Sequence, residues 1–142
     1  MKIAIGSDHA GFSLKQVLKE HLVQQGHEVI DEGTEADTSC DYPDYAKKVA
    51  LLVSEKSADF GALVCGTGMG MCIAANRARN VRAVVIRDDY DAKMARLHND
   101  ANVACFGGRI TAAVNAIRLI DVFLTTKFEG GRHKGRVEKL DL

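Results

Sequence analysis

The sequence has no excess charge of either sign and no long apolar run. Its 19 lysine and arginine residues balance 19 aspartate and glutamate residues. No global field therefore draws the protein toward nucleic acid or an anionic membrane surface. No apolar stretch approaches the length that spans a bilayer. A strand-like segment begins directly after Met1, so we expect no leader.

Metal-binding spacing is also missing. The four cysteines form neither a CxxC pair nor a zinc-ligand pattern: Cys40, Cys65, Cys72 and Cys105. Reduced thiols in a cytoplasmic protein are the simplest interpretation. The five histidines show no metal spacing either: His9, His21, His27, His98 and His133. We therefore expect neither a metal nor an organic cofactor.

Apolar runs typical of buried strands alternate with segments of helical periodicity. The expected strands cover residues 2–6, 27–31, 62–65, 81–86 and 101–106. The expected helices cover residues 12–25, 43–56, 71–76, 88–97 and 111–126, followed by a short final helix. Pro43, the only proline, lies where a helix begins, and Thr111 is expected to cap another. This order predicts an α/β fold, a single-domain (1–142), doubly wound (Rossmann-like) α/β/α sandwich with a five-stranded parallel sheet.

Ligands of such sheets bind beyond the carboxyl ends of the strands. The segment Phe60–Arg77 reads as a strand, a glycine turn and a helix. Cys65 ends the strand, and Gly66, Gly68 and Gly70 alternate after it. The nearby helix N-terminus favours a thiolate at Cys65, and the amides of the turn favour an anion. A buried packing role is the alternative for Cys65, and we favour the functional interpretation.

A dinucleotide-binding turn is a weaker interpretation of the same segment. The GxGxxG fingerprint requires glycine at the position of Met71. Asp88 lies at a suitable distance for a ribose contact, which keeps a non-catalytic nucleotide-binding module as an alternative.

Three further groups have both a functional and a structural interpretation. Asp8 and His9 follow the first strand, where Asp8 either contacts a ligand or caps the next helix. The segment 98–100 ends a helix away from the ligand edge, so it reads as a helix terminus unless a second subunit delivers it to the site. Arg132 and Arg136 lie four residues apart, which indicates either a phosphate clamp or a solvated basic tail. Arg77, Arg79 and Arg82 read as solvated surface.

Together these motifs resemble the type B ribose-5-phosphate isomerases, a group that includes galactose-6-phosphate and allose-6-phosphate isomerases. The matching segments run along nearly the whole chain: residues 6–11, 41–43, 65–70, 98–100, 107–109 and 129–133. The resemblance implies interconversion of D-ribose 5-phosphate and D-ribulose 5-phosphate through a cis-enediolate, in the pentose phosphate pathway and without a cofactor. A hexose-6-phosphate isomerase is the alternative within the group.

The resemblance also implies a role for each matching residue. Cys65 corresponds to the general base, and Thr67 and His98 to residues that assist opening of the sugar ring. The implied substrate-binding residues are Asp8, His9, Tyr42, Gly66, Gly68, Met69, Gly70, Asn99, Arg109, Arg132 and Arg136. Members form homodimers or dimers of dimers, so His98, Asn99 and Arg109 are expected to come from the partner chain. Members without this cysteine use a glutamate further along, where this chain has Ala74 and Ala75.

Overall fold

The computed structural model describes residues 1–141 as five strands and six helices. The strands are β1 (Lys2–Ser7), β2 (Glu28–Asp31), β3 (Phe60–Cys65), β4 (Ala83–Val85) and β5 (Val103–Gly107). The helices are α1 (Phe12–Gln24), α2 (Tyr42–Ser54), α3 (Met69–Ala75), α4 (Asp89–Leu97), α5 (Ala113–Thr125) and α6 (Arg132–Leu140). The alternation matches the sequence prediction.

All five strands are parallel and lie in the order β2-β1-β3-β5-β4. The strand order reverses direction at β1 and β3, which pair from Ile3 with Phe60 to Ser7 with Val64. The carboxyl ends of β1 and β3 therefore flank the switch point, the usual ligand position in open α/β sheets. The prediction of a doubly wound parallel sheet is confirmed.

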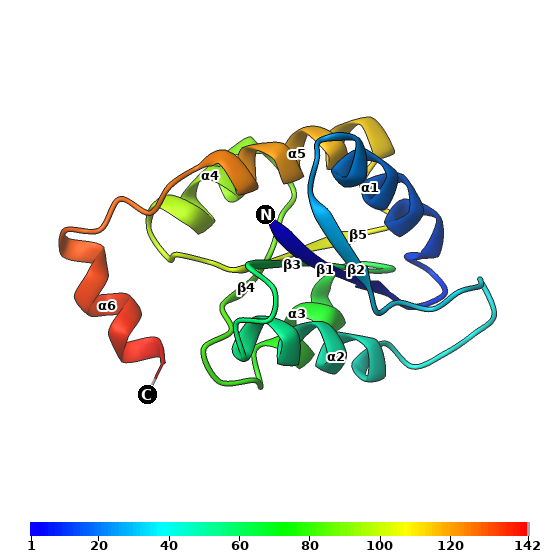
Figure 1. Ribbon diagram of the computed structural model, residues 1–142, viewed down its shortest axis with the longest axis horizontal. Coiled ribbons are helices and arrows are strands. Elements are labelled where there is room, and N and C mark those ends of the chain that lie inside the picture. Colours follow the sequence, from blue (N-terminus) through cyan, green and yellow to red (C-terminus); the bar gives the residue numbers. More distant parts are fainter. Residues whose placement is uncertain (142) are drawn as a thin grey trace.

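Helices cover both faces of the sheet (Figure 1). On one face, α1, α4 and α5 pack on side chains such as Ile5, Val64 and Phe106. On the other face, α2 and α3 pack on alternate residues of the same strands, including Leu63 and Cys65. Full burial of each large aliphatic side chain contributes about 1.5–3 kcal/mol, so both helix layers are held mainly by apolar contact.

Polar contacts determine several helix ends. Asp88 caps α4, because its Oδ1 accepts a hydrogen bond from the Asp91 N–H at 2.8 Å. The expected cap at Thr111 is wrong: α5 begins one residue later than this would require, with Ala112 at the N-cap position and no side-chain cap. Arg82 is also not solvated surface, because its side chain is 15% exposed and pairs with Asp100 and Asp141.

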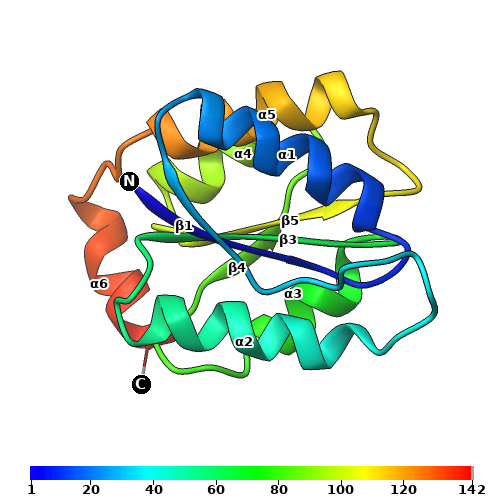
Figure 2. The same ribbon diagram turned by 45° about the vertical axis from the view of Figure 1, so that its right-hand side comes forward.

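The last helix, α6, lies outside the two helix layers (Figure 2). It stands at the end of the sheet where the strands begin, opposite the edge toward which they run (Figure 2). The ion pair between Arg82 and Asp141, at 2.7 Å, ties its C-terminal end to the segment before β4. Within residues 1–141, no helix is long and apolar enough to cross a membrane.

Candidate active site

Cys65 is the last residue of the central strand β3 and faces the layer of α2 and α3. Its side chain is buried, with 4% of the residue exposed. The Gly68 N–H donates a hydrogen bond to Cys65 Sγ at 3.2 Å. The backbone can turn back onto the sulfur because Gly68 has φ +79°, a conformation that favours glycine. A backbone donor thus holds the Cys65 sulfur at the switch point of the sheet.

The rest of the glycine turn packs tightly on its surroundings. Thr67 Oγ1 accepts a hydrogen bond from the Met69 N–H at 3.2 Å, at the start of α3. A Cβ at Gly70 would come within 2.7 Å of the Tyr42 ring, so the tyrosine lies directly against the turn. Two amides of the turn, those of Gly68 and Met69, are therefore already bonded within the turn.

The loop after β1 brings Asp8 and His9 to the same edge. Asp8 is buried and accepts a hydrogen bond from the Gly11 N–H at 3.1 Å, which stabilises the turn. The expectation that Asp8 caps the next helix is wrong, because Gly11 is the N-cap residue of α1 and the helix has no side-chain cap. His9 Nδ1 accepts a hydrogen bond from the Cys40 N–H at 3.2 Å. Because a backbone amide can only donate, the ring proton of neutral His9 lies on Nε2. His9 can therefore present an N–H donor to an anionic ligand.

The loop after β5 closes on the glycine turn. The N–H groups of Gly108 and Arg109 donate to the carbonyls of Cys65 and Gly66, at 2.7 and 3.1 Å. The Arg109 Nη1 atom lies 3.0 Å from the position of a Cβ on Gly66. The expectation that Arg109 comes from a partner chain is therefore wrong for this structure, since its guanidinium already lies against the turn of its own chain.

The remaining expected site residues lie at the opposite edge of the sheet. His98 follows α4, and a cavity of about 310 Å³ is lined by His98, Asn99, His133, Arg136, Val137 and Leu140. Arg132 lines a neighbouring hollow with Glu129 and His133. A strand of six residues, such as β3, is roughly 20 Å long, and this length separates these groups from Cys65. One chain alone does not bring the two groups together.

The motif at 98–100 has a structural role as well. Asp100 Oδ1 accepts a hydrogen bond from Arg96 Nη1 at 2.8 Å, and Asp100 Oδ2 lies 3.4 Å from Arg82. Arg96 is buried, and its guanidinium lies over the rings of Phe60 and Phe123. Asp100 therefore neutralises an arginine in the apolar layer, which holds the turn after His98 in place.

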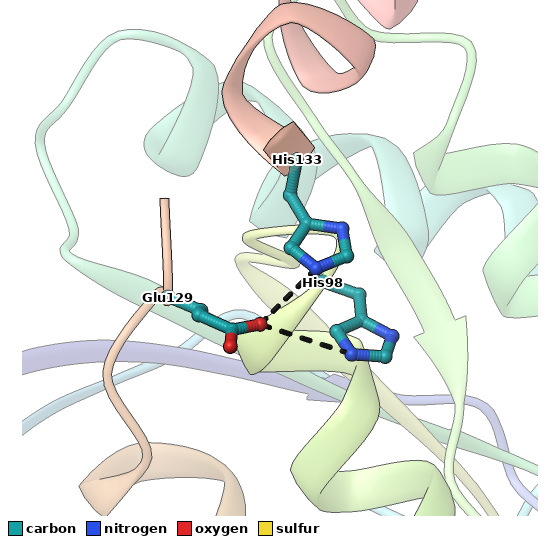
Figure 3. A group of neighbouring side chains, drawn as sticks. All are labelled: His98, Glu129 and His133. Atoms are coloured by element: carbon teal, nitrogen blue, oxygen red, sulfur yellow. Dashed lines mark ion pairs between the residues drawn. The ribbon is translucent and has the colours of Figure 1, made fainter. Parts of the chain in front are cut away.

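Sequence reasoning missed a cluster of His98, Glu129 and His133 (Figure 3). The two imidazole rings stack with their centroids 4.3 Å apart and their planes at 17°. Glu129 Oε2 lies 3.1 Å from His133 Nε2 and 4.0 Å from His98 Nε2. The i, i+4 spacing of Glu129 and His133 in the sequence was a signal that could have suggested two of the three residues. The third, His98, lies 31 residues before Glu129.

A second thiol near the turn has altered acidity. A hydrogen bond from the Cys105 thiol lowers the pKa of Cys72 to about 7, and the opposing effect of burial is smaller. The pKa of Cys105 itself is raised well above its ordinary value, first by that same hydrogen bond and then by complete burial. The packing role that the sequence predicts for Cys72 does not account for this lowered pKa.

The structure removes one of the two observations that favoured a nucleotide-binding module, the position of Asp88. The Asp88 carboxylate is engaged as the cap of α4, so it is not free for a ribose hydroxyl. The site that the described residues assemble is instead a thiol, a glycine turn, an aspartate, a histidine, a tyrosine and an arginine, around the carboxyl ends of β1, β3 and β5.

Known proteins match this chain along nearly its whole length. Residues 3–140 match the family model described as Ribose/Galactose Isomerase. The ribose-5-phosphate isomerase B of Escherichia coli is 48% identical over 139 residues, which cover 98% of this chain and 93% of that protein. A crystal structure of a ribose 5-phosphate isomerase from Thermotoga maritima has a TM-score of 0.96 at 51% identity, covering 99% of this chain and 97% of that one.

A third relative carries a ligand in its structure. The ribose-5-phosphate isomerase B of Mycoplasma genitalium, solved with bound ribulose-5-phosphate, has a TM-score of 0.94 at 42% identity, covering 98% of this chain and 93% of that one. The family model and the identity over nearly full length lead to one conclusion. The chain belongs to the Ribose/Galactose Isomerase family.

Proposed function

We propose that this protein interconverts D-ribose 5-phosphate and D-ribulose 5-phosphate, with Cys65 as the general base. Its relatives in the family support the substrate, since the ribose-5-phosphate isomerase B of Escherichia coli is 48% identical and the ribulose-5-phosphate-bound ribose-5-phosphate isomerase B of Mycoplasma genitalium is 42% identical. The single observation that carries the mechanism is the position of Cys65. Its sulfur lies at the switch point of the sheet and accepts the Gly68 N–H at 3.2 Å.

The chemistry requires two protons to move, one from C2 to C1 and one from the hydroxyl on C2 to the oxygen on C1. The Cys65 thiolate takes the proton from C2 of the open-chain aldose, which leaves a cis-enediolate. The resulting thiol returns a proton to C1, while the proton of the C2 hydroxyl passes to the C1 oxygen. Amides of the turn 66–70 stabilise the negative oxygens of this intermediate. Since the Gly68 and Met69 amides are bonded to Cys65 and Thr67 in the free protein, they become available only if the substrate displaces those bonds.

Thr67 and His98 assist ring opening in this proposal, and Asp8 and Tyr42 contact the sugar. His9, through its Nε2–H, binds the phosphate together with Arg109 of the same chain. Arg132 and Arg136 complete the phosphate site. A cationic, preorganised grip on the remote phosphate orients the reacting carbons and lowers the entropic cost of the reaction.

A second copy of this chain supplies His98, Asn99, Arg132 and Arg136. Their separation from Cys65 by roughly the length of a strand supports this part of the proposal. Exposed apolar side chains near the glycine turn support it as well. Four of them are each 60–72% exposed: Met69 and Ile73 on α3, Ile110 before α5 and Val114 in the first turn of α5. A homodimer interface would bury such side chains. Monomeric proteins rarely expose large contiguous apolar patches to solvent.

A steady-state assay of metal-free protein tests the function. Ribose 5-phosphate, allose 6-phosphate and galactose 6-phosphate are offered at equal concentration, and product formation is measured for each. We expect a clear preference for ribose 5-phosphate. Activity on a hexose phosphate alone would retain the site residues and change the substrate. No turnover of any of the three would contradict the isomerase proposal.

A further inference from the structure

Three potential metal ligands converge at the edge of the sheet that the catalytic thiol does not occupy. His98 follows α4, Glu129 precedes α6, and His133 lies in its first turn (Figure 3). One donor atom from each lies within 4.8 Å of the others. Two imidazoles and a carboxylate form a common ligand set for Zn²⁺, with the fourth position left to water or a substrate.

The buried histidine is the observation that points to a ligand. His133 has a side chain only 7% exposed, and its Nε2 has no hydrogen-bond partner. Glu129 Oε2 lies 3.1 Å from that nitrogen, but the contact lacks hydrogen-bond geometry. A buried polar atom without a partner is costly, and a bound cation would satisfy both the nitrogen and the carboxylate.

The spacing of the donor atoms fits a transition metal closely. Ligand bonds of about 2.0–2.1 Å place the donors of a tetrahedral ion roughly 3.3 Å apart. The distance of 3.1 Å between His133 Nε2 and Glu129 Oε2 is already close to this separation. The distance of 4.0 Å between His98 Nε2 and Glu129 Oε2 is slightly too long. The two rings are almost parallel, so one must tilt before both can point at one ion. His98 has this freedom, since its side chain is 37% exposed.

We propose that His98, Glu129 and His133 form a binding site for Zn²⁺ or a similar divalent transition metal, and that the bound ion inhibits the enzyme. The inhibition rests on the proposed function, in which His98 assists ring opening. A metal that tilts the His98 ring and occupies its nitrogen removes it from that role. Arg136 lines the same cavity, and its positive charge disfavours a cation, so binding depends on the donor strength of the two imidazoles.

Titration of the metal-free full-length chain with Co²⁺ tests binding without any activity measurement. We expect one Co²⁺ per chain, with visible d–d bands and without the near-ultraviolet band of a sulfur ligand, which separates this site from the cysteines. Glu129→Gln and His133→Ala should each weaken binding by at least the roughly 10- to 100-fold that loss of an outer-shell partner costs. His21→Ala is the matched control, because His21 pairs with Asp121 between α1 and α5, and it should bind like the unmodified chain.

A sulfur-ligand band, or binding that survives both substitutions, would overturn the metal site. The inhibition is then measured as the Zn²⁺ concentration that halves isomerase activity. We expect this concentration to rise at least tenfold in Glu129→Gln, in step with its loss of Co²⁺ affinity, and to stay unchanged in His21→Ala. Stoichiometric binding without inhibition would overturn the inhibitory role. A chain that turns over no sugar phosphate would refute the proposed function, while the Co²⁺ titration would still decide the metal site.

Discussion

Cys65 shows how one side chain acquires its chemistry from its neighbours. The sulfur lies at the end of a central strand, where the next backbone segment folds back and donates the Gly68 N–H. A thiol in this setting is buried from water yet lies at the ligand edge. A hydrogen bond from the Cys105 thiol lowers the pKa of Cys72, only seven residues later, to about 7. Loss of activity on alkylation would therefore not identify the base without variants of both residues.

We expect Cys65→Ala to fold and to lower kcat by roughly 10²- to 10⁴-fold, the usual contribution of a general base. In the proposed mechanism, Cys65 is the only side chain that moves the proton between C2 and C1, and alanine cannot accept a proton. Cys72→Ala is the matched control and should retain activity, because the Cys72 sulfur donates to the carbonyl of Ala83, the first residue of β4. Circular dichroism confirms the fold, and steady-state kinetics give kcat. Near-normal turnover by Cys65→Ala would assign the base to another residue.

Gly70 tests the placement of Tyr42. A Cβ at this position would come within 2.7 Å of the tyrosine ring, and Tyr42 is 40% exposed, so the ring can move away without disturbing the fold. We expect Gly70→Ala to fold normally and to lower kcat/KM by about 10- to 100-fold, as a displacement of around an ångström can do. Gly135→Ala in α6 is the control, since nothing lies within 4 Å of its added methyl group. Equal kinetics for the two variants would remove Tyr42 from the sugar site.

At the scale of elements, a buried lysine joins α1 to the long loop that leads to the site. Lys15 Nζ donates to both Asp31 carboxylate oxygens and to the Thr34 carbonyl, each at 2.9 Å. Its side chain is 2% exposed. Cys40 lies near the end of the loop 32–41, and its N–H donates to His9. The ion pair therefore anchors the segment that determines which nitrogen of His9 carries the proton.

Asp31→Asn should destabilise the protein by about 3–5 kcal/mol, because it leaves the buried Lys15 charge without its counterion. Urea denaturation at neutral pH measures this loss. Glu28→Gln, which breaks an exposed pair with Lys2 at 3.6 Å, should cost at most about 1 kcal/mol. If both variants lost an equally small free energy of unfolding, the Lys15–Asp31 pair would not anchor the loop.

The same pair predicts a pH dependence. Burial acts to raise the pKa of Asp31, but the hydrogen bonds from two lysines and one amide outweigh it and hold the pKa below its usual value of 3.8. A group with a lowered folded-state pKa stabilises the protein above its unfolded pKa, and this stabilisation is lost as the pH falls through the folded pKa. The difference in unfolding free energy between the unmodified chain and Asp31→Asn should therefore shrink as the pH falls below about 4. If the difference in unfolding free energy stayed constant as the pH fell below about 4, the lowered pKa of Asp31 would be contradicted.

At the scale of the whole molecule, the residues of the proposed site lie in two groups at opposite edges of one sheet. The thiol, the glycine turn and Arg109 lie at the carboxyl edge. The second group, His98, Arg132 and Arg136, lines hollows beside α6, which stands at the opposite edge (Figure 2). A homodimer in which each group meets the other chain's opposite group would create two complete sites. In the proposed dimer, α6 carries Arg132 and Arg136 to the site of the other chain.

Complementation between two inactive variants tests this arrangement. Cys65→Ala and His98→Ala should each be almost inactive, but after unfolding together and refolding they should recover roughly a quarter of normal activity, because half of the dimers then contain one intact site. Each variant refolded alone is the control. No recovery from a mixture shown to exchange subunits would place His98 and Cys65 in the same chain's site, or remove His98 from the mechanism.

Local pattern was sufficient for the order of strands and helices and for the chemistry of the carboxyl edge. Apolar periodicity identifies each element, and parallel strands bring the residues that follow them to one edge, so the grouping of Asp8, His9 and Cys65 could be predicted. Packing between distant segments was required for the rest. The proton position on His9 depends on the Cys40 amide, and the burial of Arg82 depends on Asp100 and Asp141. The histidine pair with Glu129 depends on where α6 docks, and no periodicity encodes that contact because it is made by side chains far apart in the sequence.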